Sequence, residues 1–289
     1  MKKRLVVCLF ITVSILGVVG RHPIAKSEVS FDKISVEEIL AKHLESIGKP
    51  EARKSGHSRV IAGTTRVTFR SRGVATADGG AVLASDDEMS MITMKFESSQ
   101  YPYEKIGFDG KKVTAYQLHP GDYSSLGSFA RTFPEIFKEG LLGGTLSSAW
   151  PLLDFSSRRA KMEFAGTRKI NSRDLLVIKY SPHGGSDLNM TLFFDPESFQ
   201  HVRTVYERTI SSQMGRTPEQ SPSQSATHYE LVEEFSDFKT EGGLTLPHTY
   251  KIHLGQQGSS TQVSEWTMSL IRFVFNQKLD ARDFDVSSD

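Results

Sequence analysis

The sequence predicts a mainly β protein: a curled antiparallel sheet with an N-terminal helix and a short helical insertion. Apolar and polar residues alternate with a period of two over most of the chain after residue 56. Turn residues such as Asp109-Gly110 separate the alternating runs. Roughly ten or eleven strands follow one another, and the short connections between them make neighbouring strands antiparallel. We therefore expect a meander that curls.

The first 27 residues have the pattern of a cleaved secretory signal peptide. Lys2, Lys3 and Arg4 precede an apolar run from Leu5 to Val19. This run of about 15 residues is shorter than the roughly 20 residues of a membrane-spanning helix. An uncleaved N-terminal anchor is the alternative. We expect a periplasmic protein that is exported through this cleaved signal peptide, residues 1–27.

Charge and cysteine content exclude several classes of protein. The chain of 289 residues has 35 basic and 34 acidic residues. Loss of residues 1–27 would remove five basic residues and leave a balance of −4. Nucleic-acid binders carry a basic surplus, so we expect no nucleic-acid partner. The single cysteine, Cys8, lies in the expected signal peptide, which excludes a disulfide framework and a cysteine zinc site.

One amphipathic helix is expected after the signal peptide, at residues 36–47. Its apolar face consists of Val36, Ile39, Leu40, His43, Leu44 and Ile47 at helical spacing. Ser35 and Glu38 have the spacing of a capping box, and Gly48 with Pro50 is expected to end the helix.

The rest of the domain consists of strands. The runs predicted as strands are residues 66–70, 89–96, 103–108, 112–118, 161–169, 174–180, 188–194, 201–210, 228–238, 244–254 and 262–275. Turns rich in glycine, proline and aspartate connect most of them, including Asp109-Gly110 and Gly242-Gly243.

Two segments interrupt the strands. Residues about 125–155 are predicted to form two short helices that pack over the sheet and hinge at Gly143 and Gly144. Residues about 211–226 are rich in serine, glutamine, threonine and proline, and are expected to be a flexible hairpin loop. Strand patterning resumes after this loop, so we expect residues 28–289 to form a single domain.

The sequence has no recognisable catalytic pattern. The nine histidines show no metal-ligand spacing, no serine lies in a Gly-x-Ser-x-Gly elbow, and no glycine-rich phosphate loop precedes a helix. Asp86-Asp87-Glu88 is expected to be a solvated turn. Glu233 and Glu234 are adjacent in a strand, so they face opposite ways and form no acid/base pair. We therefore expect neither an enzyme nor a metal site or cofactor.

Apolar residues on the inner face of the expected sheet and in the insertion are the candidates for a ligand cavity with a helical lid. They are Phe69, Met94, Phe96, Phe108, Phe133, Phe137, Leu142 and Trp150. The alternative is that each of them is ordinary core and that the insertion is a static plug.

Several segments resemble the LolA/LolB type of outer-membrane lipoprotein carrier, and more closely LolA-like proteins of unassigned role. They are Gly107–Lys111, Leu192–Ser198, Phe235–Phe238 and Gly242–Pro247. The resemblance covers residues of about 33–285. It implies a half-open β-barrel with helices as a lid and a hydrophobic cavity for acyl chains, in which cargo is passed between membrane sites without covalent chemistry. We carry over none of the carriers' functional residues.

These observations predict a non-catalytic periplasmic carrier or binding protein for lipid or lipoprotein acyl chains, or for another apolar ligand. The expected partners are a lipid or an acylated protein, with a membrane-anchored envelope protein as a further partner, and we expect a monomer. The alternative is an envelope sensor or regulatory interaction module of the same fold.

Overall fold

The computed structural model describes residues 34–71, 73–211, 226–258 and 261–287. The expected signal peptide lies outside these residues, and so does nearly all of the expected loop at 211–226. None of the helices in the described ranges is both long enough and apolar enough to cross a bilayer.

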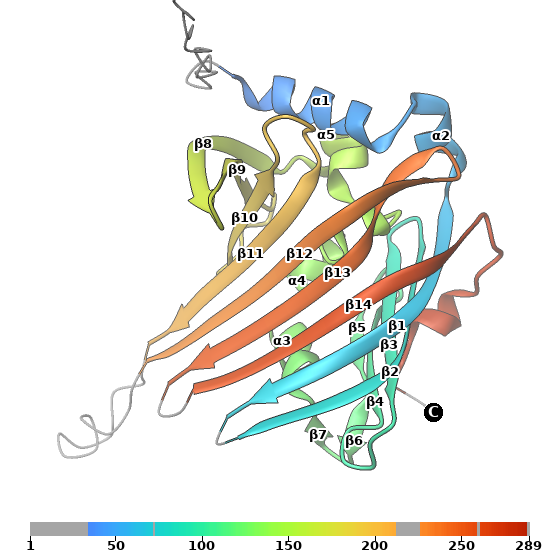
Figure 1. The fold of residues 1–289 in the computed structure, drawn as a ribbon, viewed down its shortest axis with the longest axis vertical. Coiled ribbons are helices and arrows are strands. Elements are labelled where there is room, and N and C mark those ends of the chain that lie inside the picture. Colours follow the sequence, from blue (N-terminus) through green and yellow to red (C-terminus); the bar gives the residue numbers. More distant parts are fainter. Residues whose placement is uncertain (1–33, 72, 212–225, 259–260, 288–289) are drawn as a thin grey trace, which may run out of the picture. The chain divides into compact units, whose positions relative to one another are not determined.

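Twelve strands form one antiparallel sheet, in the order β5-β4-β3-β2-β1-β14-β13-β12-β11-β10-β9-β8 (Figure 1). Their bounds are β1 Ser58–Arg70, β2 Val74–Asp86, β3 Met89–Phe96, β4 Tyr103–Phe108, β5 Val113–Ala115, β8 Lys161–Ile170, β9 Arg173–Ser181, β10 Asn189–Phe194, β11 His201–Ile210, β12 Thr227–Glu241, β13 Leu244–Gln257 and β14 Thr261–Phe275. A separate two-stranded sheet pairs β6 (Gln117–His119) with β7 (Asp122–Tyr123).

The curled antiparallel sheet that the sequence predicts is confirmed. It consists of two meanders. Strands β1 to β5 form one and β8 to β14 the other, and they join where β1 pairs with β14 along its length. The sequence predicts the meander and its interruption by the insertion, but it does not predict the pairing of β1 with β14. Strands β5 and β8 each have one neighbour in the described sheet, so the curled sheet remains open between them.

The helices are α1 Val36–Ile47, α2 Pro50–Ser55, α3 Ser125–Thr132, α4 Glu135–Lys138 and α5 Phe155–Arg158, with 3-10 turns η1 Gly144–Leu146, η2 Pro151–Asp154 and η4 Ala281–Phe284. Residues 124–158, from the N-cap of α3 to the end of α5, are called the insertion below. The insertion connects the side of the sheet that ends in β5 to the opposite edge strand, β8. In Figure 1 its helices lie behind the long strands.

Helix α1 occupies the predicted residues and packs on β13, β8 and η2. Ser35 caps it, because its Oγ accepts a hydrogen bond from the backbone N–H of Glu38. The carboxylate of Glu38 pairs with Lys42, at 2.7 Å, so the structure contains half of the expected capping box. Ile39, Leu40, His43 and Ile47 are the buried residues of this helix.

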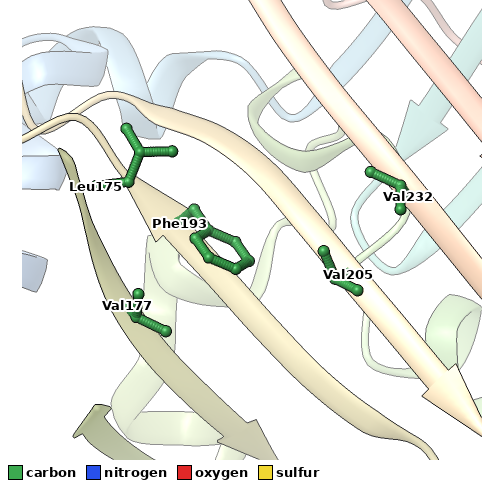
Figure 2. Close-up of a cluster of buried hydrophobic side chains, with 5 residues drawn as sticks. All are labelled: Leu175, Val177, Phe193, Val205 and Val232. Carbon is green, nitrogen blue, oxygen red and sulfur yellow. The ribbon is translucent and has the colours of Figure 1, made fainter. Parts of the chain in front are cut away.

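The outer face of the sheet has a small apolar cluster of its own, formed by β9 to β12 (Figure 2). It consists of Leu175, Val177, Phe193, Val205 and Val232, with Ile170 and Val202 packed against it. The alternate residues of these strands point to the inner face, where the insertion lies. Strand β9 therefore has four consecutive buried residues, Leu175–Ile178, and both of its faces are covered.

Candidate functional site

The predicted cavity residues lie inside the protein but do not surround one cavity. Seven of them are buried: Met94, Phe96, Phe108, Phe133, Phe137, Leu142 and Trp150. Phe69 is half-buried, and its ring makes edge-to-face contacts with the rings of Tyr101 and Trp266. Phe137 and Leu142 line the same small cavity. Phe133 packs with Phe129 and Tyr229 instead. Phe69 and Phe96 pack against Tyr101, and Trp150 packs against His201, so the predicted set is divided among several places in the interior.

The cavity beside Phe137 and Leu142 is small. Its volume is about 20 Å³. It is lined by Leu83, Ala84, Ser85, Ser90, Met91, Ile92, Phe137, Leu142, Gly143, Leu146 and Ser147. A site for a drug-sized ligand needs on the order of 300–1,000 Å³, and a single water needs about 10–15 Å³. This cavity is therefore large enough for about one water molecule and too small for an acyl chain.

A buried carboxyl group binds the middle of the insertion. The side chain of Glu233, on β12, is fully buried and accepts a hydrogen bond of 2.7 Å from the backbone N–H of Gly143. The hydroxyls of Tyr206 and Tyr250 donate to the same carboxyl at 2.7 and 2.5 Å. Burial raises the pKa of Glu233 to about 7, although these three hydrogen bonds oppose the rise.

A second buried carboxyl group binds the start of the insertion. Glu104, on β4, accepts a hydrogen bond of 2.8 Å from the hydroxyl of Ser124, and that hydroxyl in turn accepts from the N–H of Gly127 as the N-cap of α3. Tyr101 donates its hydroxyl hydrogen to Glu104, and the Trp266 indole N–H donates to the Tyr101 oxygen at 3.1 Å. Burial raises the pKa of Glu104 to about 7.

A buried arginine holds the segment that follows Gly144. Arg59, on β1, is 1% exposed, and its Nη1 donates to the carbonyls of Thr145 and Ser147 at 2.5 and 3.1 Å. Burial lowers the pKa of Arg59 to about 10, so it remains a cation at neutral pH. Next to it the hydroxyl of Ser85 accepts from the N–H of Ser148 at 2.9 Å. The insertion is therefore tied to the sheet by polar groups at several points.

Two histidines enclose Trp150, at the end of the insertion near α1. The Trp150 indole N–H donates to Nε2 of His43 at 3.1 Å, and Nδ1 of His43 lies 3.0 Å from the carbonyl oxygen of Phe199. Because a carbonyl only accepts and an indole N–H only donates, His43 is neutral with its proton on Nδ1. Burial lowers its pKa to about 4. His201 stacks on Trp150 with ring centres 4.6 Å apart.

The predicted hinge glycines are part of this packed contact. Gly143 and Gly144 have φ values of 82° and 51°, in the left-handed region that favours glycine. A Cβ atom at Gly144 would lie 2.9 Å from Nδ1 of His201 and 3.0 Å from the ring of Phe235. Glycine is thus required at Gly144 both for its backbone conformation and for close packing, whereas Gly143 has free space around its Cα.

The polar groups Arg59, Glu104 and Glu233 are absent from the set of residues that we predicted as the site. Each occupies an inward position of its strand, for example Glu233 between Leu231 and Phe235. A charged residue within an inward-facing apolar series is the signal that could have identified them. The prediction that Glu233 and Glu234 face opposite ways is confirmed, since Glu234 pairs with Arg203 on the outer face.

The described residues contain no group of three or more His, Cys, Asp or Glu side chains that could hold a metal ion. Of the predicted turn Asp86-Asp87-Glu88, Asp87 and Glu88 form the exposed turn between β2 and β3, whereas Asp86 is the last residue of β2.

Comparison with known proteins gives a likeness at the level of the fold. No family model and no curated protein matches the chain. Similar solved structures include a LolA superfamily protein from Nitrosomonas europaea, with 13% identity over 87% of this chain and 97% of that chain and a TM-score of 0.47. The sequence motifs resemble the same superfamily.

Two further solved structures show a similar coverage. A DUF1329 family protein from Desulfovibrio piger has 10% identity over 87% of this chain and 97% of that chain, with a TM-score of 0.39. The lipoprotein LppX from Mycobacterium tuberculosis has 13% identity over 86% of this chain and all of that chain, with a TM-score of 0.23.

Proposed function

We propose that residues 28–289 act as one non-catalytic carrier or binding unit in the periplasm, for a lipid, an acylated protein or another apolar ligand. In this proposal the ligand's apolar part replaces the insertion on the inner face of the sheet. Gly143 and Gly144 are the hinge about which the insertion moves, and the eight predicted apolar residues contact the ligand once the insertion has moved.

The observation that carries this proposal is the way in which the insertion is held. Glu104, Glu233 and Arg59 are almost completely buried, yet each contributes a hydrogen bond to the insertion. A permanently closed core would be at least as stable with apolar residues at such positions. When the insertion moves away, these polar groups can form hydrogen bonds with water instead. Such contacts therefore favour an insertion that opens and closes.

The free energy of ligand burial is large enough to drive such an opening. Removing one methylene group from water contributes about 0.8 kcal/mol. A chain of about 15 methylenes therefore supplies on the order of 12 kcal/mol, an upper limit, to offset the loss of the contacts between the insertion and the sheet.

The proposal can be tested on the exported protein, purified from the cells that export it. We expect native mass spectrometry to show a mass excess that disappears after extraction with organic solvent and corresponds to a lipid. The extracted protein should then take up one equivalent of palmitate. A clean polypeptide mass, with no uptake of palmitate or of a lipopeptide, would contradict the carrier function.

One observation favours the alternative, an envelope sensor or interaction module whose partner is a membrane-anchored protein. The outer face of the sheet has a hollow of about 360 Å³ that is lined mostly by charged side chains. The lining residues are Arg203, Glu230, Val232, Glu234, Lys251, His253 and Glu265. A clean polypeptide mass together with a co-purifying membrane protein would make this the better function.

A further inference from the structure

Arg59 is a buried cation to which the structure gives no carboxylate partner within the described ranges. Its two hydrogen bonds both leave from Nη1, toward the carbonyls of Thr145 and Ser147. Its Nε and Nη2 atoms are buried and have no acceptor among the described residues. Burying an uncompensated charge is costly, so this guanidinium is a strong site for an incoming anion.

The two free nitrogens of Arg59 form one edge of the guanidinium group. Arg66, on the same strand, shows what this edge binds: its Nε and Nη2 donate to the two carboxylate oxygens of Asp78, at 2.6 and 2.9 Å. This paired arrangement is the preferred geometry for carboxylate and phosphate groups. Arg59 presents the same edge in the interior, where exclusion of water strengthens the interaction.

The surroundings of Arg59 change from polar to apolar over a short distance. The hydroxyl of Thr145 is buried and has no partner, like the free edge of Arg59. Ser85, the register partner of Arg59 on β2, and Ser147 line the small cavity. The other lining residues include Leu83, Ile92, Phe137, Leu142 and Leu146. Arg59 is not itself a lining residue, but it is the register partner of Ser85 and donates to the carbonyl of Ser147, so a cation lies next to the polar side of an otherwise apolar cavity. This order of groups matches the two ends of an amphiphile.

We propose that the Nε–Nη2 edge of Arg59 binds the anionic head group, a carboxylate or a phosphate, of a single-chain amphiphile. The chain of this amphiphile then lies along the inner face that the insertion otherwise covers. This inference rests on the proposed carrier function and adds the chemical class of its ligand. Binding of the head group gives Arg59 its counter-ion at the edge that has no acceptor in the described ranges, separate from Nη1, which donates to the two carbonyls of the insertion.

The experiment compares three probes that share a chain of 16 carbons: palmitate, hexadecyl phosphate and 1-hexadecanol. Their affinities for the full exported chain are measured by titration of tryptophan fluorescence. We expect wild-type protein to bind at least one of the two anionic probes at least tenfold more tightly than 1-hexadecanol. The tighter of the two anions identifies the head group as carboxylate or phosphate.

Arg59→Gln should remove this preference: its affinities for the preferred anion and for 1-hexadecanol should lie within threefold of each other, whatever the loss of the contacts with Thr145 and Ser147 does to both. Arg59→Lys keeps the positive charge but cannot form the paired hydrogen bonds. Its affinity for the preferred anion should be at least threefold lower than that of wild type. Glu233→Gln is the matched control, because Glu233 also holds the insertion but is no cation. It should change the affinities for the anionic and neutral probes equally.

Equal affinities of the wild-type protein for all three probes would overturn this inference and leave the carrier function standing. A preference for anions that survives in Arg59→Gln would overturn it as well. If no probe binds to wild-type protein, the carrier function itself fails. Circular dichroism checks the folding of each variant. If Arg59→Gln does not fold, the test uses Arg59→Lys instead. An affinity of this variant for the preferred anion equal to that of wild type would overturn the inference.

Discussion

Trp150→Ala should lower the free energy of unfolding by about 3–5 kcal/mol, the range for truncation of a large buried aromatic residue. Trp150 is 1% exposed and stacks on His201. Its indole N–H is also the donor to Nε2 of His43, which would remain buried without that partner. The substitution therefore creates a cavity and an unsatisfied polar atom where α1, the insertion and β11 meet.

Denaturant unfolding followed by circular dichroism measures this effect at pH 7. Trp150→Phe is the control, because it keeps an aromatic ring against His201 while it removes the N–H donor and part of the ring volume. It should cost less than Trp150→Ala because it leaves a smaller cavity, and the unsatisfied buried Nε2 of His43 contributes about 1–3 kcal/mol of this loss. A loss below 1 kcal/mol for Trp150→Ala would mean that this end of the insertion is not packed against the sheet.

The stability of the protein should decrease as the pH rises from about 5 to about 8 through the effect of Glu104 and Glu233. Their pKa values are raised from an ordinary value of 4.5 to about 7 in the folded state. Between these pH values the folded state binds more protons than the unfolded state, so stability falls with rising pH. The change amounts to about 2–3 kcal/mol per carboxyl group, since one pKa unit corresponds to about 1.4 kcal/mol.

The buried histidines act in the opposite direction at lower pH. The pKa values of His43 and His201 are lowered by burial, so the stability they contribute is present above about 6.5 and is lost on acidification. Unfolding measured from pH 5 to 8 on wild type and on the double variant Glu104→Gln/Glu233→Gln separates the two effects. The difference between the proteins should vary by several kcal/mol over this range. A difference that does not depend on pH would show that these carboxyl groups are not buried.

Local patterns in the sequence were sufficient to predict most of the strands and helix α1. Strands β3 and β4 begin and end at the predicted residues, because alternation and the Asp109-Gly110 turn are encoded locally. Strand β2 was missed, since its glycines and alanines are depleted in strands. Gly79 is nevertheless required there: a Cβ atom would lie 1.9 Å from the carbonyl oxygen of Lys95 on β3.

Local sequence patterns could not predict which distant strands pair, or which polar groups contact the insertion. The pairing of β1 with β14 joins residues about 200 positions apart, and no local pattern encodes it. Seven of the eight apolar candidates are buried and Phe69 is half-buried; for those on strands, alternation determines the face. Hydrophobic patterning, however, assigns charged residues to the surface, so Arg59 and Glu104 were overlooked. Their hydrogen bonds to the insertion become visible only when the two segments are brought together.

In the proposed function, the insertion must leave the inner face of the sheet before a ligand can bind. This requirement can be tested by linking the insertion to the sheet with a disulfide. Ser125, the first residue of α3, and Ser264, on β14, have their Oγ atoms 3.4 Å apart. The variant Ser125→Cys/Ser264→Cys, in a chain that also carries Cys8→Ser, would contain these two cysteines alone.

Palmitate uptake by this double-cysteine variant is measured before and after reduction, with each single-cysteine variant as a control for the substitution itself. We predict that the oxidised protein takes up palmitate at least 100-fold more slowly than the reduced protein, and that reduction restores the wild-type rate. Equal uptake by the oxidised and reduced proteins would show that the ligand binds without movement of α3, contrary to the role of the insertion as a lid.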